Sequence, residues 1–157
     1  MKPAFVRPIK SPGMTSIETL LKNPEIRAAL RLAWRESEPG PSGGHEEGGF
    51  IVQDSVGALR VIPWPRGASN TIDVPFHPDG YVDGLQIIAS FHTHPNTSPV
   101  YLQEPSETDK RAVRDDPDLK APHYVGELVI SAALLYGVTP SGGVVELGET
   151  EKTLAQA

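Results

Sequence analysis

The apolar residues at positions 17–38 recur at the three- and four-residue spacings of an α-helix, and they predict a helical stretch in two parts. Asn23 followed by Pro24 and an acid has the pattern of an N-cap with proline in the first helical position. The second part is expected to end near Glu38, because the PGPSGG segment that follows cannot continue a helix. Trp34 lies on the apolar side of this second helical part and is expected in the core.

Beyond residue 44 the periodicity changes from helical to strand-like. Short apolar runs at 50–52 and 59–62, separated by a turn candidate at 54–57, predict a β-hairpin. The run LQIIASF at 85–91 contains neither proline nor glycine. It is the best candidate for a central strand, because strands covered on both faces read as continuous apolar runs.

A second helix is expected at 107–115, with Ser106 as its N-cap. Later strands are expected at 124–131, 134–138 and 144–147. The order of elements is therefore helix, strands, helix and strands. This order predicts an α/β or α+β fold in which helices flank a mixed β-sheet.

The 157 residues are enough for one domain with a sizeable core. We expect an extended arm over 1–13, a folded domain over 14–150 and a C-terminal tail over 151–157. The 15 glycines and 16 prolines indicate many turns and argue against a helix bundle. The absence of cysteine excludes a disulfide scaffold, cysteine-ligated zinc, an iron–sulfur centre and a thiol nucleophile.

The formal net charge of −6 is unevenly distributed. Residues 1–36 carry seven lysines and arginines against three glutamates, whereas the rest of the chain has a net charge of −10. An acidic body repels phosphate groups, so we expect no nucleic-acid partner. We find no apolar run long enough for a transmembrane helix and no apolar core of a signal peptide. We therefore expect no membrane partner and a cytoplasmic location.

Two histidines follow the predicted central strand in the sequence His-Thr-His-Pro, at positions 92–95. Side chains two positions apart lie on one face of a strand, about 6.6 Å apart along the backbone. His92 and His94 can therefore converge on one metal ion at the end of the strand, where open sheets commonly place their sites. A pair of hydrogen-bonded surface histidines is the alternative explanation.

Ser106 and Asp109 form a Ser-x-x-Asp pair at the start of the second predicted helix. Such a pair is typical of a capping box. It also offers a third metal ligand, because a catalytic zinc site needs three protein ligands and an open position for water. Two imidazoles with one carboxylate suit zinc better than magnesium or calcium. The two roles are compatible, since a ligand in a capped first turn is held rigidly.

Glu46 and Glu47 precede Gly48 and Gly49 in the loop before the first predicted strand. Adjacent acids in a loop are commonly no more than solvated side chains. A metal-dependent hydrolase, however, requires a general base near its metal, and a carboxylate is a common choice. The helical His-Glu-x-x-His motif is excluded, because Gly49 occupies the position of its second histidine.

Taken together, Glu-x-x-Gly-Phe-Ile-Val, His-Thr-His-Pro and Ser-x-x-Asp resemble the motif of the JAMM (MPN-plus) zinc metallopeptidases, in their bacterial JAB-like branch. The resemblance covers about residues 46–115 directly. It implies a cytidine-deaminase-like α/β domain and a Zn²⁺ ion bound by His92, His94 and Asp109.

The same resemblance implies Glu46 as the base that activates water. Glu46 is preferred over Glu47 because the family glutamate typically lies three residues before a glycine, as Glu46 does before Gly49. Ser106 is implied as a hydrogen-bond donor to the tetrahedral intermediate. The implied activity is hydrolysis of a peptide or isopeptide bond in a protein or peptide substrate, including bonds to ubiquitin-like proteins. Bacterial relatives also serve as modules of toxin and phage systems.

The interval from His94 to Asp109 spans 15 positions, about four more than is usual in the family. The extra residues fall in a predicted loop at 96–105, where added length costs little. Tyr101 and Leu102 of this loop are weaker candidates for the lining of a substrate groove. Structural or surface roles are expected for the remaining candidates, which are His45, His77, His123 and Trp64.

Two other functions are compatible with the same residues. One is a catalytically silent scaffold or interaction module of the same fold, although all five motif residues are present. The other is a non-proteolytic zinc hydrolase such as an amidase. Zinc-dependent nucleotide deaminases are disfavoured, because their Pro-Cys-x-x-Cys motif requires cysteine.

Overall fold

Two capped helices open the part of the chain that this computed structural model describes, residues 16–155. Helix α1 is Ile17–Leu20 and helix α2 is Pro24–Glu36. The side chain of Asn23 accepts hydrogen bonds from the first backbone N–H groups of α2, which confirms its predicted capping role. The expected arm at 1–13 lies outside the described residues.

Seven strands form one mixed sheet. Six of them follow the order β2-β1-β4-β5-β6-β7, and β3 pairs with the first two residues of β4. Every pairing is antiparallel except that of β4 with β5. The chain crosses from β4 to β5 through helix α3. The bounds are β1 Gly48–Gln53, β2 Leu59–Pro63, β3 Tyr81–Val82, β4 Leu85–Thr93, α3 Glu107–Arg114, β5 Glu127–Ile130, β6 Leu134–Val138 and β7 Val144–Glu149.

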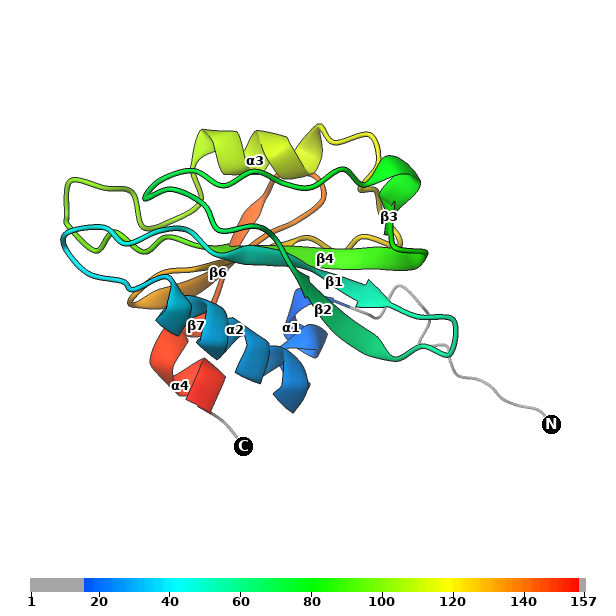
Figure 1. Cartoon of the computed structure of the whole chain (residues 1–157), viewed down its shortest axis with the longest axis horizontal. Helices are drawn as coiled ribbons and strands as arrows, with labels where there is room; N and C mark the ends of the chain where they lie inside the picture. Colours follow the sequence, from blue (N-terminus) through cyan, green and yellow to red (C-terminus); the bar gives the residue numbers. More distant parts are fainter. Residues whose placement is uncertain (1–15, 156–157) are drawn as a thin grey trace.

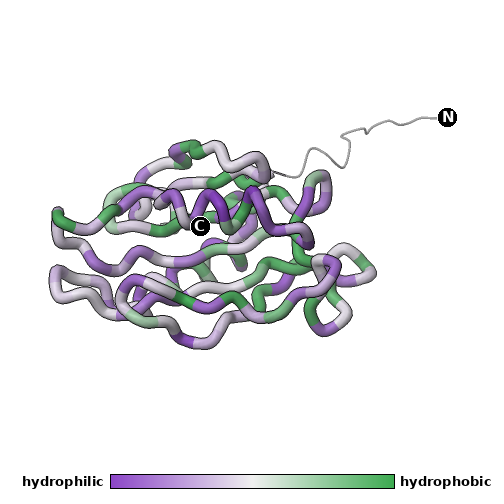
Figure 2. Tube along the Cα trace, turned by 90° about the horizontal axis from the view of Figure 1, so that it is seen from above, coloured by the Kyte–Doolittle hydropathy of each residue, from purple (hydrophilic) through white to green (hydrophobic). Residues whose placement is uncertain are grey.

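Helices cover both faces of the sheet (Figure 1). Helices α1, α2 and the C-terminal helix α4 (Thr150–Ala155) lie on one face, and α3 lies on the other. Each interface has its own core of buried side chains, with Leu30 and Leu128 in the first and Phe50 and Val129 in the second. Hydrophobic and hydrophilic stretches alternate over short distances along the trace (Figure 2). The described chain is thus one mixed α/β domain.

The C-terminal segment differs from its prediction as a tail over 151–157. Its described part belongs to α4, whose Leu154 is buried against the first core. The Arg31 side chain of α2 donates a hydrogen bond to the backbone carbonyl of Leu154. A six-residue helix with two buried residues, Thr150 and Leu154, carries little periodic signal, and tertiary contacts of this kind stabilise it.

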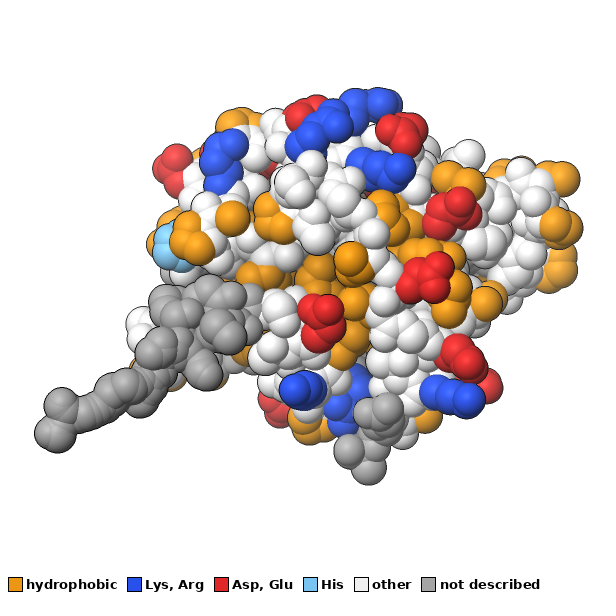
Figure 3. Space-filling model, turned by 180° about the vertical axis from the view of Figure 1, so that it is seen from behind, with side chains coloured by type: hydrophobic (Ala, Val, Ile, Leu, Met, Phe, Trp, Pro, Cys, Tyr) orange, Lys and Arg blue, Asp and Glu red, His pale blue; other side chains and the backbone are white. Residues whose placement is uncertain are grey.

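The surface seen from behind carries charged side chains of both signs around exposed hydrophobic ones (Figure 3). Basic side chains gather over α3 at the upper edge of this face. No helix within residues 16–155 is long and apolar enough to cross a membrane.

The two glycines that open β1 allow the loop before it to approach the central strand. Gly48 pairs with His92 of β4. A Cβ atom on Gly48 would lie 2.5 Å from a ring carbon of Trp64 and 2.7 Å from the carbonyl oxygen of Phe91. Only a residue without a side chain therefore fits between β4 and the indole ring.

We predict that Gly48→Ala lowers the free energy of unfolding by about 1–3 kcal/mol, because overpacking forces the backbone or Trp64 to move. Gly40→Ala is the matched control, since a Cβ atom there meets nothing within 4 Å. The control should change stability by less than about 0.5 kcal/mol. Chemical denaturation of the three proteins measures the difference, and equal stabilities would contradict the packing argument.

Candidate metal centre

Strand β4 positions the two histidines on one face of the sheet. His92 is the eighth residue of this nine-residue strand and is 4% exposed. The backbone N–H of His94 donates to the carbonyl of Ile130, which continues the parallel pairing just past the strand. The two rings lie with centroids 5.0 Å apart and Nε2 atoms 3.2 Å apart. The predicted convergence of His92 and His94 is therefore present.

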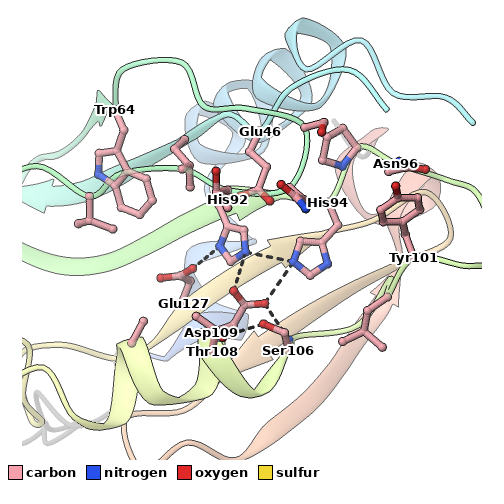
Figure 4. Close-up of a pocket in the computed structure, with 18 residues that line it drawn as sticks. Glu46, Trp64, His92, His94, Asn96, Tyr101, Ser106, Thr108, Asp109 and Glu127 are labelled. Atoms are coloured by element: carbon pink, nitrogen blue, oxygen red, sulfur yellow. Dashed lines mark hydrogen bonds and ion pairs between the residues drawn. The ribbon is translucent and has the colours of Figure 1, made fainter. Parts of the chain in front are cut away.

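Helix α3 brings Asp109 to the same point (Figure 4). The Asp109 Oδ1 atom lies 3.3 Å from His92 Nε2, and its Oδ2 atom lies 3.2 Å from His94 Nε2. The same residue completes a capping box: Ser106 Oγ accepts from the Asp109 N–H at 3.1 Å, and Asp109 Oδ2 accepts from the Ser106 N–H at 2.8 Å. Capping and convergence on the histidines thus occur together.

The Nδ1 atom of each histidine ring lies next to a hydrogen-bond acceptor. His94 Nδ1 lies 3.0 Å from the carbonyl oxygen of Gln103, and His92 Nδ1 contacts a carboxylate oxygen of Glu127. A carbonyl group can only accept, so Nδ1 of His94 carries a proton, and Nε2 is the nitrogen that faces His92 and Asp109. The ligand atoms of His92, His94 and Asp109 all lie within 4.8 Å of one another, so these residues can hold one metal ion.

A cavity of about 440 Å³ opens over the three residues. Glu46, Ser106, Tyr101 and Leu102 contribute to its lining, so the structure brings all the candidate residues of the sequence analysis together. Glu46 is 7% exposed, whereas Tyr101 and Leu102 are about half exposed at the edge of the cavity.

Glu46 and Glu47 point to different places. Glu47 is not among the described residues that line the cavity, and its carboxylate binds His45 Nε2 at 2.7 Å. The Arg66 side chain lies 3.4 Å from the same oxygen of Glu47. Glu46 therefore faces the histidines and Asp109, and Glu47 belongs to a separate ion pair outside the cavity.

The protein environment gives the carboxylates of the site different affinities for protons. Burial raises the pKa of Glu46, and the nearby His92 and His94 only partly offset this. Burial also acts to raise the pKa of Asp109, but hydrogen bonds from the same two histidines outweigh it and hold this pKa far below its usual range. Asp109 is thus kept ionised, whereas Glu46 accepts a proton more readily.

The charge on His92 depends on its acidic neighbours. Burial alone would lower its pKa, yet the carboxylates of Glu127 and Asp109 raise it well above the usual value. The arrangement of His92, Asp109 and Glu127 therefore attracts positive charge, either as a proton on the ring or as a bound cation.

Sequence reasoning missed Glu127 and Gln103. Glu127 had a signal, because it is the charged residue of the otherwise apolar strand ELVI, and all four residues of this strand are buried. A buried charge in a strand requires a partner. No sequence signal points to Gln103, because it contributes a backbone carbonyl group whose direction depends on the folded loop.

Trp64 and His77 have structural roles, in line with the sequence analysis. Trp64 is buried and packs edge-on against Phe50, with ring centroids 5.2 Å apart. His77 Nδ1 lies 2.7 Å from the carbonyl oxygen of Pro75, and its Nε2 lies 2.7 Å from Asp116 Oδ2. Asp118 completes a second group that can hold a metal ion, but the bonds of His77 already account for its position.

Comparisons of this chain with protein-family models, with curated proteins and with solved structures give no significant match. What the site does therefore has to follow from its donor atoms and their geometry.

We predict that the His77–Asp116 pair stabilises the fold mainly at low pH. Burial acts to lower the pKa of His77, but the Pro75 carbonyl and Asp116 outweigh this and raise it. The stabilisation is complete below the pKa of the unfolded chain, about 6.5, and is lost as the pH rises through the higher pKa of the folded protein.

Asp116→Asn should therefore destabilise the protein by about 1.5–3 kcal/mol near pH 5.5 and by less near pH 9. Denaturation at both pH values measures the difference, and Asp73→Asn, at an exposed position, is the control. A loss that is equal at the two pH values would contradict the charged state of the pair.

Proposed function

We propose that this chain is a zinc-dependent hydrolase that cleaves a peptide or isopeptide bond. The observation that carries the proposal is the spacing of the three donor groups. The Nε2 atoms are 3.2 Å apart, and the Asp109 oxygens lie 3.2 and 3.3 Å from them. Two ligands of a tetrahedral zinc ion with bonds of 2.0–2.1 Å are about 3.3 Å apart. The spacing of these donor groups is therefore compatible with a bound zinc ion.

The chemistry of the donors also favours zinc. Magnesium and calcium prefer oxygen ligands, whereas two imidazoles with one carboxylate form a typical catalytic zinc site. Three protein ligands leave a fourth position open, and the cavity of about 440 Å³ gives a substrate access to it.

The motif order supports a relationship to JAMM metallopeptidases. The glutamate lies before β1, the histidine pair at the end of β4 and the Ser-x-x-Asp pair at the start of α3. The mixed sheet with helices on both faces is compatible with the fold expected from that resemblance. The same proposal includes protein or peptide substrates, among them conjugates of ubiquitin-like proteins, and a cytoplasmic location.

Each residue of the site has a role in the proposed reaction. A zinc ion held by His92, His94 and Asp109 would polarise the scissile carbonyl and activate water for attack. Glu46 takes the proton from the attacking water and transfers it to the leaving amine nitrogen. Its raised pKa suits this role, because the carboxyl must hold the proton between the two transfers.

Ser106 has a hydroxyl proton available for the substrate. Its Oγ accepts the capping hydrogen bond from Asp109 and therefore does not use its own proton there. Ser106 can donate this proton in a hydrogen bond to the substrate oxygen that becomes negatively charged. Tyr101 and Leu102, at the edge of the cavity, offer apolar contacts to the chain on either side of the scissile bond.

We predict about one zinc ion per chain after expression with sufficient zinc. His92→Ala or His94→Ala should lose the metal, because two protein ligands are too few to hold it, whereas His77→Ala should retain it. Zinc affinity should fall at acidic pH, because imidazole must be neutral to bind. Elemental analysis measures the metal content. A wild-type protein without zinc would favour the scaffold function instead.

We predict that Glu46→Gln lowers the rate of hydrolysis by about 10²–10⁴ while zinc content and fold are retained. The amide keeps the shape of the side chain but cannot accept the proton. Glu47→Gln is the matched control and should retain activity, because Glu47 lies outside the cavity and pairs with His45. A panel of ubiquitin-like fusions and peptides provides the substrates. An active Glu46→Gln protein with an inactive control would reverse the assignment.

A further inference from the structure

We propose that Glu127 is a positioning residue of the metal centre, which holds His92 in the one tautomer that can bind a metal. This inference rests on the metal site of the proposed function, but not on the hydrolytic reaction. Glu127 is not part of the motif that the sequence analysis identified, and it does not contact the metal-facing nitrogens.

The parallel pairing of β4 and β5 places Glu127 beside the histidine. In this pairing Ser90 lies opposite Glu127, two positions before His92 on the same face of β4. One oxygen of the Glu127 carboxylate contacts His92 Nδ1, and the other lies 2.7 Å from Ser90 Oγ (Figure 4 shows the first contact). Glu127 and Ser90 are 9% and 1% exposed, so little water can replace either contact.

The network extends one residue further, to Tyr124. The Tyr124 hydroxyl lies 2.5 Å from Ser90 Oγ and is fully buried. Ser90 uses its proton in the bond to Glu127, so Tyr124 donates to Ser90. Burial raises the pKa of Tyr124 well above its usual value, so its phenol proton stays in place. Tyr124, Ser90 and Glu127 thus form a chain of hydrogen bonds that all point toward the carboxylate.

This direction of the hydrogen bonds determines the tautomer of His92. The carboxylate of Glu127 accepts from Ser90 on one oxygen and is left as an acceptor on the other. An unprotonated Nδ1 would place its lone pair against that oxygen, which is unfavourable. When a metal ion takes the place of the second ring proton, Nδ1 therefore keeps its own proton, and Nε2 is the nitrogen that faces His94 and Asp109. Carboxylate partners of this kind orient metal-ligating histidines and increase their basicity.

The two histidines differ in what holds them. His94 depends on the backbone carbonyl of Gln103, which no substitution removes, whereas His92 depends on a side chain. The contribution of Glu127 is therefore open to a direct test. Zinc dissociation constants are measured by competition with a chelator for the wild type, Glu127→Gln and Glu127→Ala.

Both variants should bind zinc about 10–100-fold more weakly than the wild type. Glu127→Gln keeps the shape of the side chain, and thermal melting identifies any variant that fails to fold. Asp116→Asn is the matched control, because it removes the carboxylate partner of His77, a histidine outside the ligand set. Its zinc affinity should equal that of the wild type. Ser90→Ala should weaken binding less than either Glu127 variant, since the carboxylate itself is retained.

Nitrogen-15 NMR of the metal-free proteins measures the tautomer of His92 directly. This tautomer would not change if Glu127 had only a structural role. At a pH where His92 is neutral, the wild type should show the Nδ1–H tautomer. Glu127→Gln should populate the Nε2–H tautomer, because the Gln amide N–H can donate to Nδ1.

Unchanged zinc affinity and an unchanged tautomer in both variants would overturn the role of Glu127 and leave the proposed function intact. A wild-type protein that binds zinc but cleaves no substrate, with weakened variants, would support Glu127 and overturn the hydrolase. A wild-type protein that binds no zinc would overturn both.

Discussion

The parallel pairing of β4 with β5 is the constraint on which the site depends. Parallel neighbours cannot be joined by a tight turn, so the chain has to cross one face of the sheet between them. That crossover carries α3, and its first turn comes to rest beside the end of β4. His92 and His94 therefore meet Asp109, and the register of the same pairing places Glu127 behind His92. One topological feature thus brings together the three candidate metal ligands and Glu127.

Three carboxylates share this small volume, and their environments separate their roles. Asp109 accepts hydrogen bonds in the capping box and from both histidines, which holds its pKa low and suits a ligand. Glu46 is buried with weaker compensation, so its pKa is raised and it can carry a proton. Glu127 is committed to Ser90 and His92. Titratable groups whose environments push their pKa values apart are typical of acid–base sites.

The loop at 96–105 connects His94 to Ser106 and is held together by Gln103. Gln103 turns this loop back on itself, because its side-chain amide donates to the carbonyls of Asn96 and Tyr101 at 2.8 and 3.0 Å. The same residue presents its own carbonyl to His94. The exposed part of the loop projects outward, with Tyr101 at the edge of the cavity, and Asp109 reaches the histidines. The loop therefore shapes the wall of the cavity without separating Asp109 from His92 and His94.

The sequence by itself determined the elements with strong local signals and the candidate metal ligands that lie in or next to them. Asn23 caps a helix, residues 85–91 form the central strand, and Ser106 with Asp109 opens α3, because capping and periodicity are local. Only the tertiary structure decided which carboxylates face the histidines. Glu46 lines the cavity whereas Glu47 pairs with His45, and Glu127 contacts His92. These arrangements depend on strand register and on the direction of the loop before β1. The contact of Glu127 with His92 joins residues 35 positions apart, a separation that no local pattern encodes.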